Sequence, residues 1–303
     1  MKRRAIGFLL LIAALLSLAA CAKQEATDEP YFIMDGAVYK QAAPLRPEQV
    51  LLAADKINIQ IEAHPEAGSV YLAVIPDKGR YIGVEGGGSK ADYDEKVDII
   101  CGAVPDAQYI DLFGTLSAQD FYRTDIHWRQ ERILPAAQAL CSAMGAASPA
   151  ETDFTKTELG EFTGALVAQS ELSAEPEMLY TMESAAVKSA AVKDYEDKPL
   201  AIYSPEKLES AEPYDVFLSG AQPVITIESP AAASDRELVI FRDSFGSSLA
   251  PLLVEGYQKV TLVDLRYIQT NAIGAFIDFE NQDVLFEYST LMLNQGLGGA
   301  LAQ

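Results

Sequence analysis

The chain has 303 residues, of which 49% are hydrophobic and 22% are charged, and its formal net charge is −21. This length and composition predict a globular protein with one large domain or two small ones. Such an acidic surface repels nucleic acid and anionic lipid head groups, so it argues against nucleic-acid binding and against a strongly anionic polymer as substrate.

The N-terminus has the pattern of a bacterial export signal. Residues 1–4 (MKRR) are basic, and the apolar run AIGFLLLIAALLSLAA that follows is too short for a convincing membrane span. Small residues precede Cys21, which resembles the lipobox of bacterial lipoproteins and implies lipidation of the Cys21 thiol. A plain signal peptide with an incidental cysteine is the alternative. We expect residues 1–20 to be a signal peptide and residues 21–30 a lipidated cysteine with a flexible tether.

Strand-like and helix-like segments alternate after this tether. YFIMDGAVYK predicts a hairpin that turns at Asp35-Gly36. The apolar patterns predict further elements in chain order: a helix after Pro47, a strand ending at Pro76, a helix over 89–103, a short strand over 107–113, a helix over 130–146, strands over 223–229 and 237–243, a helix over 247–257, and strands over 259–266 and 283–290.

This alternation predicts an α/β fold with a mainly parallel sheet sandwiched by helices. Residues 147–215 are rich in Ala, Ser, Glu and Asp and have weak periodicity, so we expect an irregular insertion there. The predicted domain organisation is therefore one domain over residues 31–303 that carries this insertion.

The mature chain would keep two cysteines, Cys101 and Cys141. In an exported protein such a pair suggests a disulfide, but both lie in apolar, helix-like stretches, so two buried free thiols are an equal alternative. No cysteine spacing is typical of a zinc site, and two histidines are too few for a histidine-rich metal centre. We expect neither a metal nor a cofactor.

The stretch VIFRDSFGSSLAPLL places a serine between a buried strand and a helix. In an open α/β sheet, Ser244 would then lie at the ligand-binding edge, with the helix dipole behind its backbone N–H. This arrangement suits a nucleophile that attacks an ester. The alternative is that Asp243 or Ser244 only caps the helix.

A nucleophilic serine needs a base, and the stretch TDIHW offers one. Asp125 and His127 are two residues apart, so both side chains would project to the same side of an extended segment. Asp125 could orient His127, and His127 could face Ser244. The alternative is that Asp125 caps the next helix and His127 lies at the surface; His64, in IEAHPEAG, reads as a turn residue.

Together, TDIHW and RDSFGSSLAPLL resemble the DHHW family, a branch of SGNH-like proteins related to periplasmic enzymes that O-acetylate alginate. The resemblance implies a catalytic triad of Asp125, His127 and Ser244 in an SGNH-like domain. It also implies an acyltransferase or esterase that acts on O-acetyl groups of a cell-envelope or extracellular glycan, with an acyl donor that the sequence does not identify.

The sequence departs from the family pattern at two places. Position 126 is Ile where the family name implies His, and Ser219-Gly220-Ala221 stands where relatives often have Gly-Gly-Asn, whose Asn helps to bind the oxyanion. Gly220 or Gln222 could supply a donor instead. These departures leave a second hypothesis open, a weak or inactive SGNH-like lipoprotein that binds glycan or a protein partner.

Trp128, the only tryptophan, could stack on a sugar face or pack under the histidine.

A solute-binding lipoprotein of a transporter is a third hypothesis that fits the export signal and the tether. It would need two similar α/β lobes, which the pattern does not show. We therefore expect a lipid-anchored, extracytoplasmic protein of the bacterial cell membrane.

Overall fold

The computed structural model describes residues 31–83 and 90–298. The predicted signal peptide and Cys21 lie outside the described residues. Within them, no helix is both long enough and apolar enough to cross a bilayer.

The predicted hairpin is present at the start of the described chain. It consists of β1 (Tyr31–Met34) and β2 (Ala37–Lys40), paired antiparallel. Asp35 and Gly36 both have positive φ, at 49° and 75°, as the tight two-residue turn requires.

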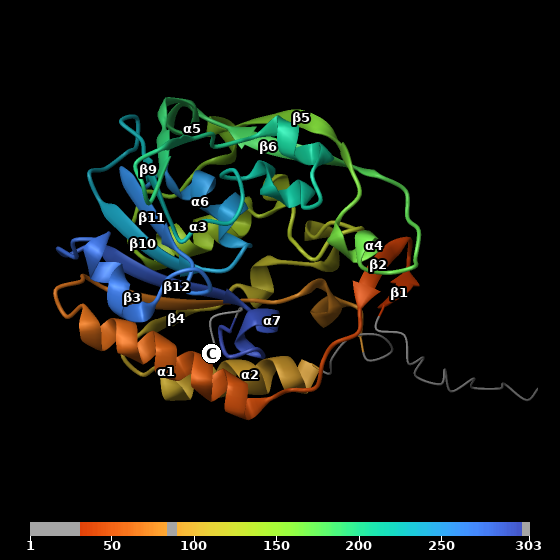
Figure 1. Ribbon diagram of the computed structural model, residues 1–303, viewed down its shortest axis with the longest axis horizontal. Coiled ribbons are helices and arrows are strands. Elements are labelled where there is room, and N and C mark those ends of the chain that lie inside the picture. The colour runs from red at the N-terminus through yellow and green to blue at the C-terminus, as the bar shows by residue number, and fades with distance from the viewer. Residues whose placement is uncertain (1–30, 84–89, 299–303) are drawn as a thin grey trace, which may run out of the picture. The chain divides into compact units, whose positions relative to one another are not determined.

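An eight-stranded sheet forms the centre of the domain, in the order β4-β3-β12-β10-β11-β9-β7-β8 (Figure 1). Its strands are β3 (Val70–Ile75), β4 (Gln108–Ile110), β7 (Ala191–Asp194), β8 (Pro199–Leu200), β9 (Val224–Glu228), β10 (Glu237–Arg242), β11 (Lys259–Val263) and β12 (Asp283–Ser289). The first five strands of this order are parallel, which confirms the predicted mainly parallel sheet. The strand over 223–229 is different, because β9 runs antiparallel to β11.

The last strand of the chain, β12, lies in the middle of the parallel region, between β3 and β10. All seven of its residues are buried. Successive side chains of a strand face opposite sides, so Leu285 packs into one core cluster and Phe286 into the other. The chain leaves β3 and β10 in opposite directions across the sheet, and such a reversal is where open α/β sheets bind ligands.

Helices cover both faces of the sheet. On one face lie α1 (Pro47–Ala63) and α2 (Lys90–Ala103), which contribute Ile57 and Ile100 to the core beneath them. On the other face lie α3 (Leu134–Ala143) and α6 (Gly246–Leu253), which contribute Leu140 and Leu252. The short helices are α4 (Ala165–Ala168), α5 (Ala185–Ser189) and α7 (Thr290–Leu293).

Residues 147–215 are more regular than the sequence predicts. They contain β5 (Thr155–Phe162) and β6 (Glu177–Glu183), which pair antiparallel, and they add β7 and β8 to the edge of the large sheet. Phe162 and Leu179 from these strands pack with Tyr122 and Tyr214 in a small core of their own. Alternation is weak here because only one residue of β5 is buried and half of its residues are exposed.

Both cysteines of the described chain are free thiols, so the disulfide alternative is excluded in this structure. Cys141 is a fully buried residue of α3, and burial raises the pKa of its thiol to about 12. Cys101 is half-buried on α2, and burial raises the pKa of its thiol as well. Neither thiol has the depressed pKa of a reactive cysteine.

Candidate active site

The loop that carries Asp125 and His127 is closed at its base by main-chain contacts. Phe121 and Trp128 form an isolated antiparallel bridge, and the Tyr122 N–H donates to the His127 carbonyl at 3.0 Å. The segment between them is irregular rather than helical. The alternative in which Asp125 caps a following helix is therefore wrong.

Asp125 and His127 face each other within this loop, as the spacing of two predicts. One carboxylate oxygen of Asp125, Oδ1, lies 2.6 Å from His127 Nδ1 and also accepts the His127 N–H at 3.0 Å. The other oxygen, Oδ2, accepts the Ala165 N–H at 2.8 Å. Gly164 allows this approach, because a Cβ at that position would lie 2.4 Å from the Asp125 Cβ.

The Asp125 carboxyl is ionised in this environment. Burial by itself raises its pKa, but the attraction of His127 and the hydrogen bonds from His127 and Ala165 outweigh burial and lower the pKa to about 2. An ionised carboxylate only accepts hydrogen bonds, so His127 carries its proton on Nδ1. This leaves Nε2 with a lone pair.

That lone pair faces Ser244. His127 Nε2 lies 2.7 Å from Ser244 Oγ, across 117 residues of sequence. Ser244 follows the carboxyl end of β10 and stays partly exposed, whereas the His127 side chain is 9% exposed. The structure thus joins Asp125, His127 and Ser244 in one hydrogen-bonded line.

Asp243, rather than Ser244, stabilises the turn before α6. Its Oδ1 accepts the Phe245 N–H at 3.0 Å, and its Oδ2 accepts the Ser289 N–H at 2.8 Å. Asp243 thereby ties the end of β10 to the end of β12. Neither Asp243 nor Ser244 caps α6, whose N-cap is Phe245 without a side-chain hydrogen bond. The Ser244 hydroxyl meets His127 instead.

Trp128 has the packing role of the two that the sequence allowed. Its side chain is fully buried, so a sugar ring has no access to it. The indole Nε1 donates to the Phe245 carbonyl at 3.1 Å and to Ser248 Oγ at 2.9 Å. Trp128 therefore fastens the histidine loop to the first turn of the helix behind Ser244.

Tyr214 is a site residue that the sequence reasoning missed. Its ring stacks on the His127 imidazole, with centroids 3.7 Å apart and planes 3° apart, and its hydroxyl donates to Ser248 Oγ at 2.6 Å. The sequence shows Tyr214 only as an aromatic residue shortly before the Ser219-Gly220-Ala221 turn. The pattern of apolar residues does not predict that this ring stacks on a histidine of another segment.

The turn 219–222 lies at the same edge of the sheet as Ser244, because antiparallel β9 begins there. Gly220 has φ +96°, and a Cβ there would lie 2.7 Å from Asp215 Cγ, so only glycine fits. Its N–H donates to the Phe217 carbonyl at 3.2 Å, so the proposed donor already has an acceptor. Ala221 is exposed and has no polar side-chain atom, and Gln222 is half-exposed.

Ile126 points away from the hydrogen-bonded line, as expected for the residue between Asp125 and His127. It lines a hollow of about 30 Å³ together with Leu166 and Leu291. This volume has room for about one water molecule. The Ile in place of His at position 126 is thus accommodated by apolar neighbours.

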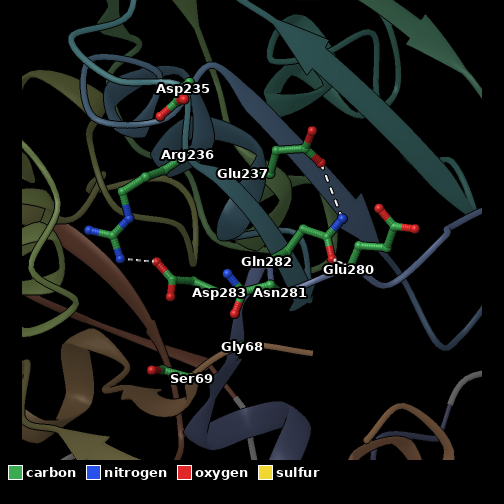
Figure 2. A pocket seen from close by; sticks show the side chains of 9 residues that line it. All are labelled: Gly68, Ser69, Asp235, Arg236, Glu237, Glu280, Asn281, Gln282 and Asp283. Carbon is green, nitrogen blue, oxygen red and sulfur yellow. Dashed lines mark hydrogen bonds and ion pairs between the residues drawn. The ribbon is translucent and has the colours of Figure 1, made fainter. Parts of the chain in front are cut away.

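A second, larger hollow lies at the opposite edge of the sheet from Ser244. Figure 2 shows its lining residues, which come from the starts of β3, β10 and β12 and enclose about 420 Å³. Arg236 pairs with Asp283, and Gln282 donates to Glu237, so these groups satisfy one another. In the described part of the chain, no cluster of His, Cys, Asp and Glu is arranged to hold a metal ion.

The fold is the SGNH-like α/β fold that the sequence resemblance implies. Residues 111–263 match the model of the DHHW protein family. Because this match spans half of the chain and includes both the histidine loop and the serine turn, the chain belongs to the DHHW family. No curated protein sequence matches it.

Solved structures share the fold at low sequence identity. A DHHW family protein from Eubacterium siraeum DSM 15702 has a TM-score of 0.72 at 20% identity, covering 88% of this chain and 93% of its own. Bacillus cereus PatB1 with a sulfonyl adduct has a TM-score of 0.68 at 20% identity, covering 88% and 96%. The O-acetyltransferase domain of Pseudomonas putida AlgJ has a TM-score of 0.52 at 16% identity, covering 88% and 92%.

We predict that acid destabilises the protein in part through Asp125. Its pKa is about 2 in the folded protein and 3.8 ordinarily, so the unfolded chain takes up this proton first as the pH falls. The stabilisation is complete above about pH 4 and is lost between about pH 4 and pH 2. Urea unfolding at pH 5.5 and pH 3 should show a larger loss of unfolding free energy for the wild type than for Asp125→Asn. Equal losses would contradict this assignment.

Proposed function

We propose that this protein is an extracytoplasmic serine acyltransferase or esterase acting on O-acetyl groups of a cell-envelope or extracellular glycan. The single observation that carries the proposal is the hydrogen-bonded line from Asp125 through His127 to Ser244, at 2.6 and 2.7 Å. A hydroxyl, a histidine and a carboxylate in this order are the arrangement that activates a serine nucleophile.

The reaction follows from the proton positions. His127 Nε2 takes the proton of Ser244 Oγ while Oγ attacks the ester carbonyl carbon, and the imidazolium then gives that proton to the departing alcohol. The acetyl group is left on Ser244. In the second half, His127 takes a proton from an incoming hydroxyl, which attacks the acetyl carbonyl, and the proton returns to Ser244.

Two groups stabilise the imidazolium formed in each half. The Asp125 carboxylate accepts its Nδ1–H, and the face of the Tyr214 ring lies against the imidazole at 3.7 Å. An aromatic face attracts a cation, so this stacking favours the protonated ring. It also holds the ring plane fixed while the proton moves.

The acceptor decides between the two activities. Transfer to a sugar hydroxyl makes the protein a transferase, and transfer to water makes it an esterase. Support for the glycan comes from the family and from the shared fold with an O-acetyltransferase domain, that of AlgJ.

Acidic groups near the site favour a glycan of low negative charge. Glu212 and Asp215 lie close enough to His127 for its charge to act on both carboxyl groups. A polyanionic chain would be repelled by these carboxyl groups as well as by the overall charge of −21.

Anchoring through a lipid on Cys21 would place the site at the outer side of the cell membrane.

We predict that an activated acetyl ester labels Ser244. The fragment from residue 22 onward, incubated with such an ester, should gain one acetyl mass by intact-protein mass spectrometry. His127→Ala removes the general base, so labelling should slow about 10²–10⁴-fold. Ser244→Ala should abolish labelling. Equal labelling of all three proteins would overturn the proposal.

A second candidate function has its own observation. Ala221 stands where relatives have the oxyanion-binding Asn, and the Gly220 N–H is already bonded to Phe217. Losing one oxyanion donor commonly costs ~10²–10³ in rate. We therefore also consider a weak or inactive SGNH-like lipoprotein that binds glycan or a protein partner. This candidate predicts sugar affinity without turnover.

Restoring an oxyanion-binding side chain at position 221 distinguishes these two functions. In an enzyme that lacks only this group, Ala221→Asn should raise the rate of Ser244 acetylation by about tenfold or more. Ala221→Leu adds a similar volume without a donor and should give no gain. A protein that has lost catalysis altogether should stay unlabelled in both variants.

A further inference from the structure

Lys78 is a buried lysine that the mechanism has not used. It begins the short 3₁₀ helix Lys78–Tyr81 that follows β3, and it is 4% exposed. Its ammonium donates to the main-chain carbonyls of Tyr122 at 2.9 Å, Arg123 at 3.2 Å and Asp125 at 2.9 Å. All three carbonyls belong to the loop that carries His127.

The N–H groups of the same loop bind an anion. Glu177, which is 6% exposed at the start of β6, accepts the N–H of Arg123 at 3.1 Å and that of Thr124 at 2.7 Å. The Thr124 hydroxyl also donates to Glu177 at 2.7 Å. The loop is thus held between a buried cation that binds its carbonyls and a buried anion that binds its N–H groups.

This arrangement cannot be explained as a substrate site. The hollow beside Lys78 and Ile126 has about 30 Å³, which is too small for a sugar or an ester. The three donors of the ammonium point at the loop. Lys78 therefore acts on the chemistry through the position of the loop.

We propose that Lys78 is a positioning residue whose ammonium group, opposite Glu177, fixes the loop that aims Asp125 and His127 at Ser244, and that loss of its proton loosens this loop. The proposal rests on the proposed function for its catalytic consequence. Loss of the proton loosens the loop because it changes the number of hydrogen-bond donors on the Lys78 nitrogen. An ammonium has three N–H groups for three carbonyls, whereas a neutral amine has two and turns a lone pair toward the third.

The charged and titratable groups that face Lys78 are Asp77 beside it, Asp125 on the loop, Glu177 on β6 and Tyr39 on β2. The Tyr39 ring centroid lies 5.0 Å from Nζ. Burial lowers the pKa of Lys78 to about 8, against the attraction of the three carboxylates. Burial also lowers the pKa of Lys96, so a variant at that lysine is the matched control for a change that belongs to Lys78.

Trp128 reports the loop directly, because it follows His127 and is the only tryptophan. We predict that the fluorescence of the fragment from residue 22 onward changes in one step near pH 8 between pH 7 and 9.5. Lys78→Met has no proton to lose and Lys78→Arg keeps its charge, so both variants should lack the step. Lys96→Met, which removes another buried lysine, should retain it. A flat wild-type titration, or a step that survives in either Lys78 variant, would overturn the proposal.

Ser244 acetylation gives the second readout. In the wild type its rate should fall as the pH rises past 8, whereas in Lys78→Arg it should not fall. In Lys78→Met it should be about 10²-fold slower at every pH, because a displacement of 1 Å costs this much, with little change in KM. If Lys78→Met fails to fold, the Lys78→Arg titration still decides. If the wild type is not acetylated, the proposed function fails while the Trp128 titration still tests Lys78.

Discussion

The two hydrogen bonds of the His127 ring are the interaction on which this site depends. They join a carboxylate two residues away to a hydroxyl 117 residues away, at 2.6 and 2.7 Å. Such a line is productive only if two separate segments keep their positions to within a fraction of an ångström. The surrounding contacts do this from three sides: Trp128 fastens the loop to α6, Tyr214 lies on the ring, and Asp243 ties the serine turn to β12.

The sequence predicts most of the fold because its apolar runs are strong where the sheet is buried on both faces. The β12 segment is an example, since all seven residues are buried and the run is continuous. Strand direction does not appear in such a pattern, so the antiparallel β9 could not be predicted. The β5–β6 pair was not predicted for the opposite reason, because only one residue of β5 is buried and its alternation is weak.

The site residues likewise divide into those that a local sequence pattern predicts and those that it does not. The pairing of Asp125 and His127 depends on local spacing, and the serine turn depends on a strand followed by a helix, so both could be predicted. Tyr214 and Lys78 could not, because each meets the histidine loop through tertiary contacts. A lysine in a polar turn after an apolar strand looks like an ordinary surface residue until its burial is known.

A sulfonyl fluoride tests the central claim most directly, since it reports the activated hydroxyl without needing a glycan or an acetyl acceptor. The measurement is the rate of sulfonylation, with the modified residue located by peptide mapping, in the wild type and in His127→Ala. We predict one sulfonyl group per chain, on Ser244, added at least about 10²-fold more slowly in the variant. Labelling at equal rates in the two proteins, or labelling elsewhere in the chain, would show that His127 does not activate Ser244.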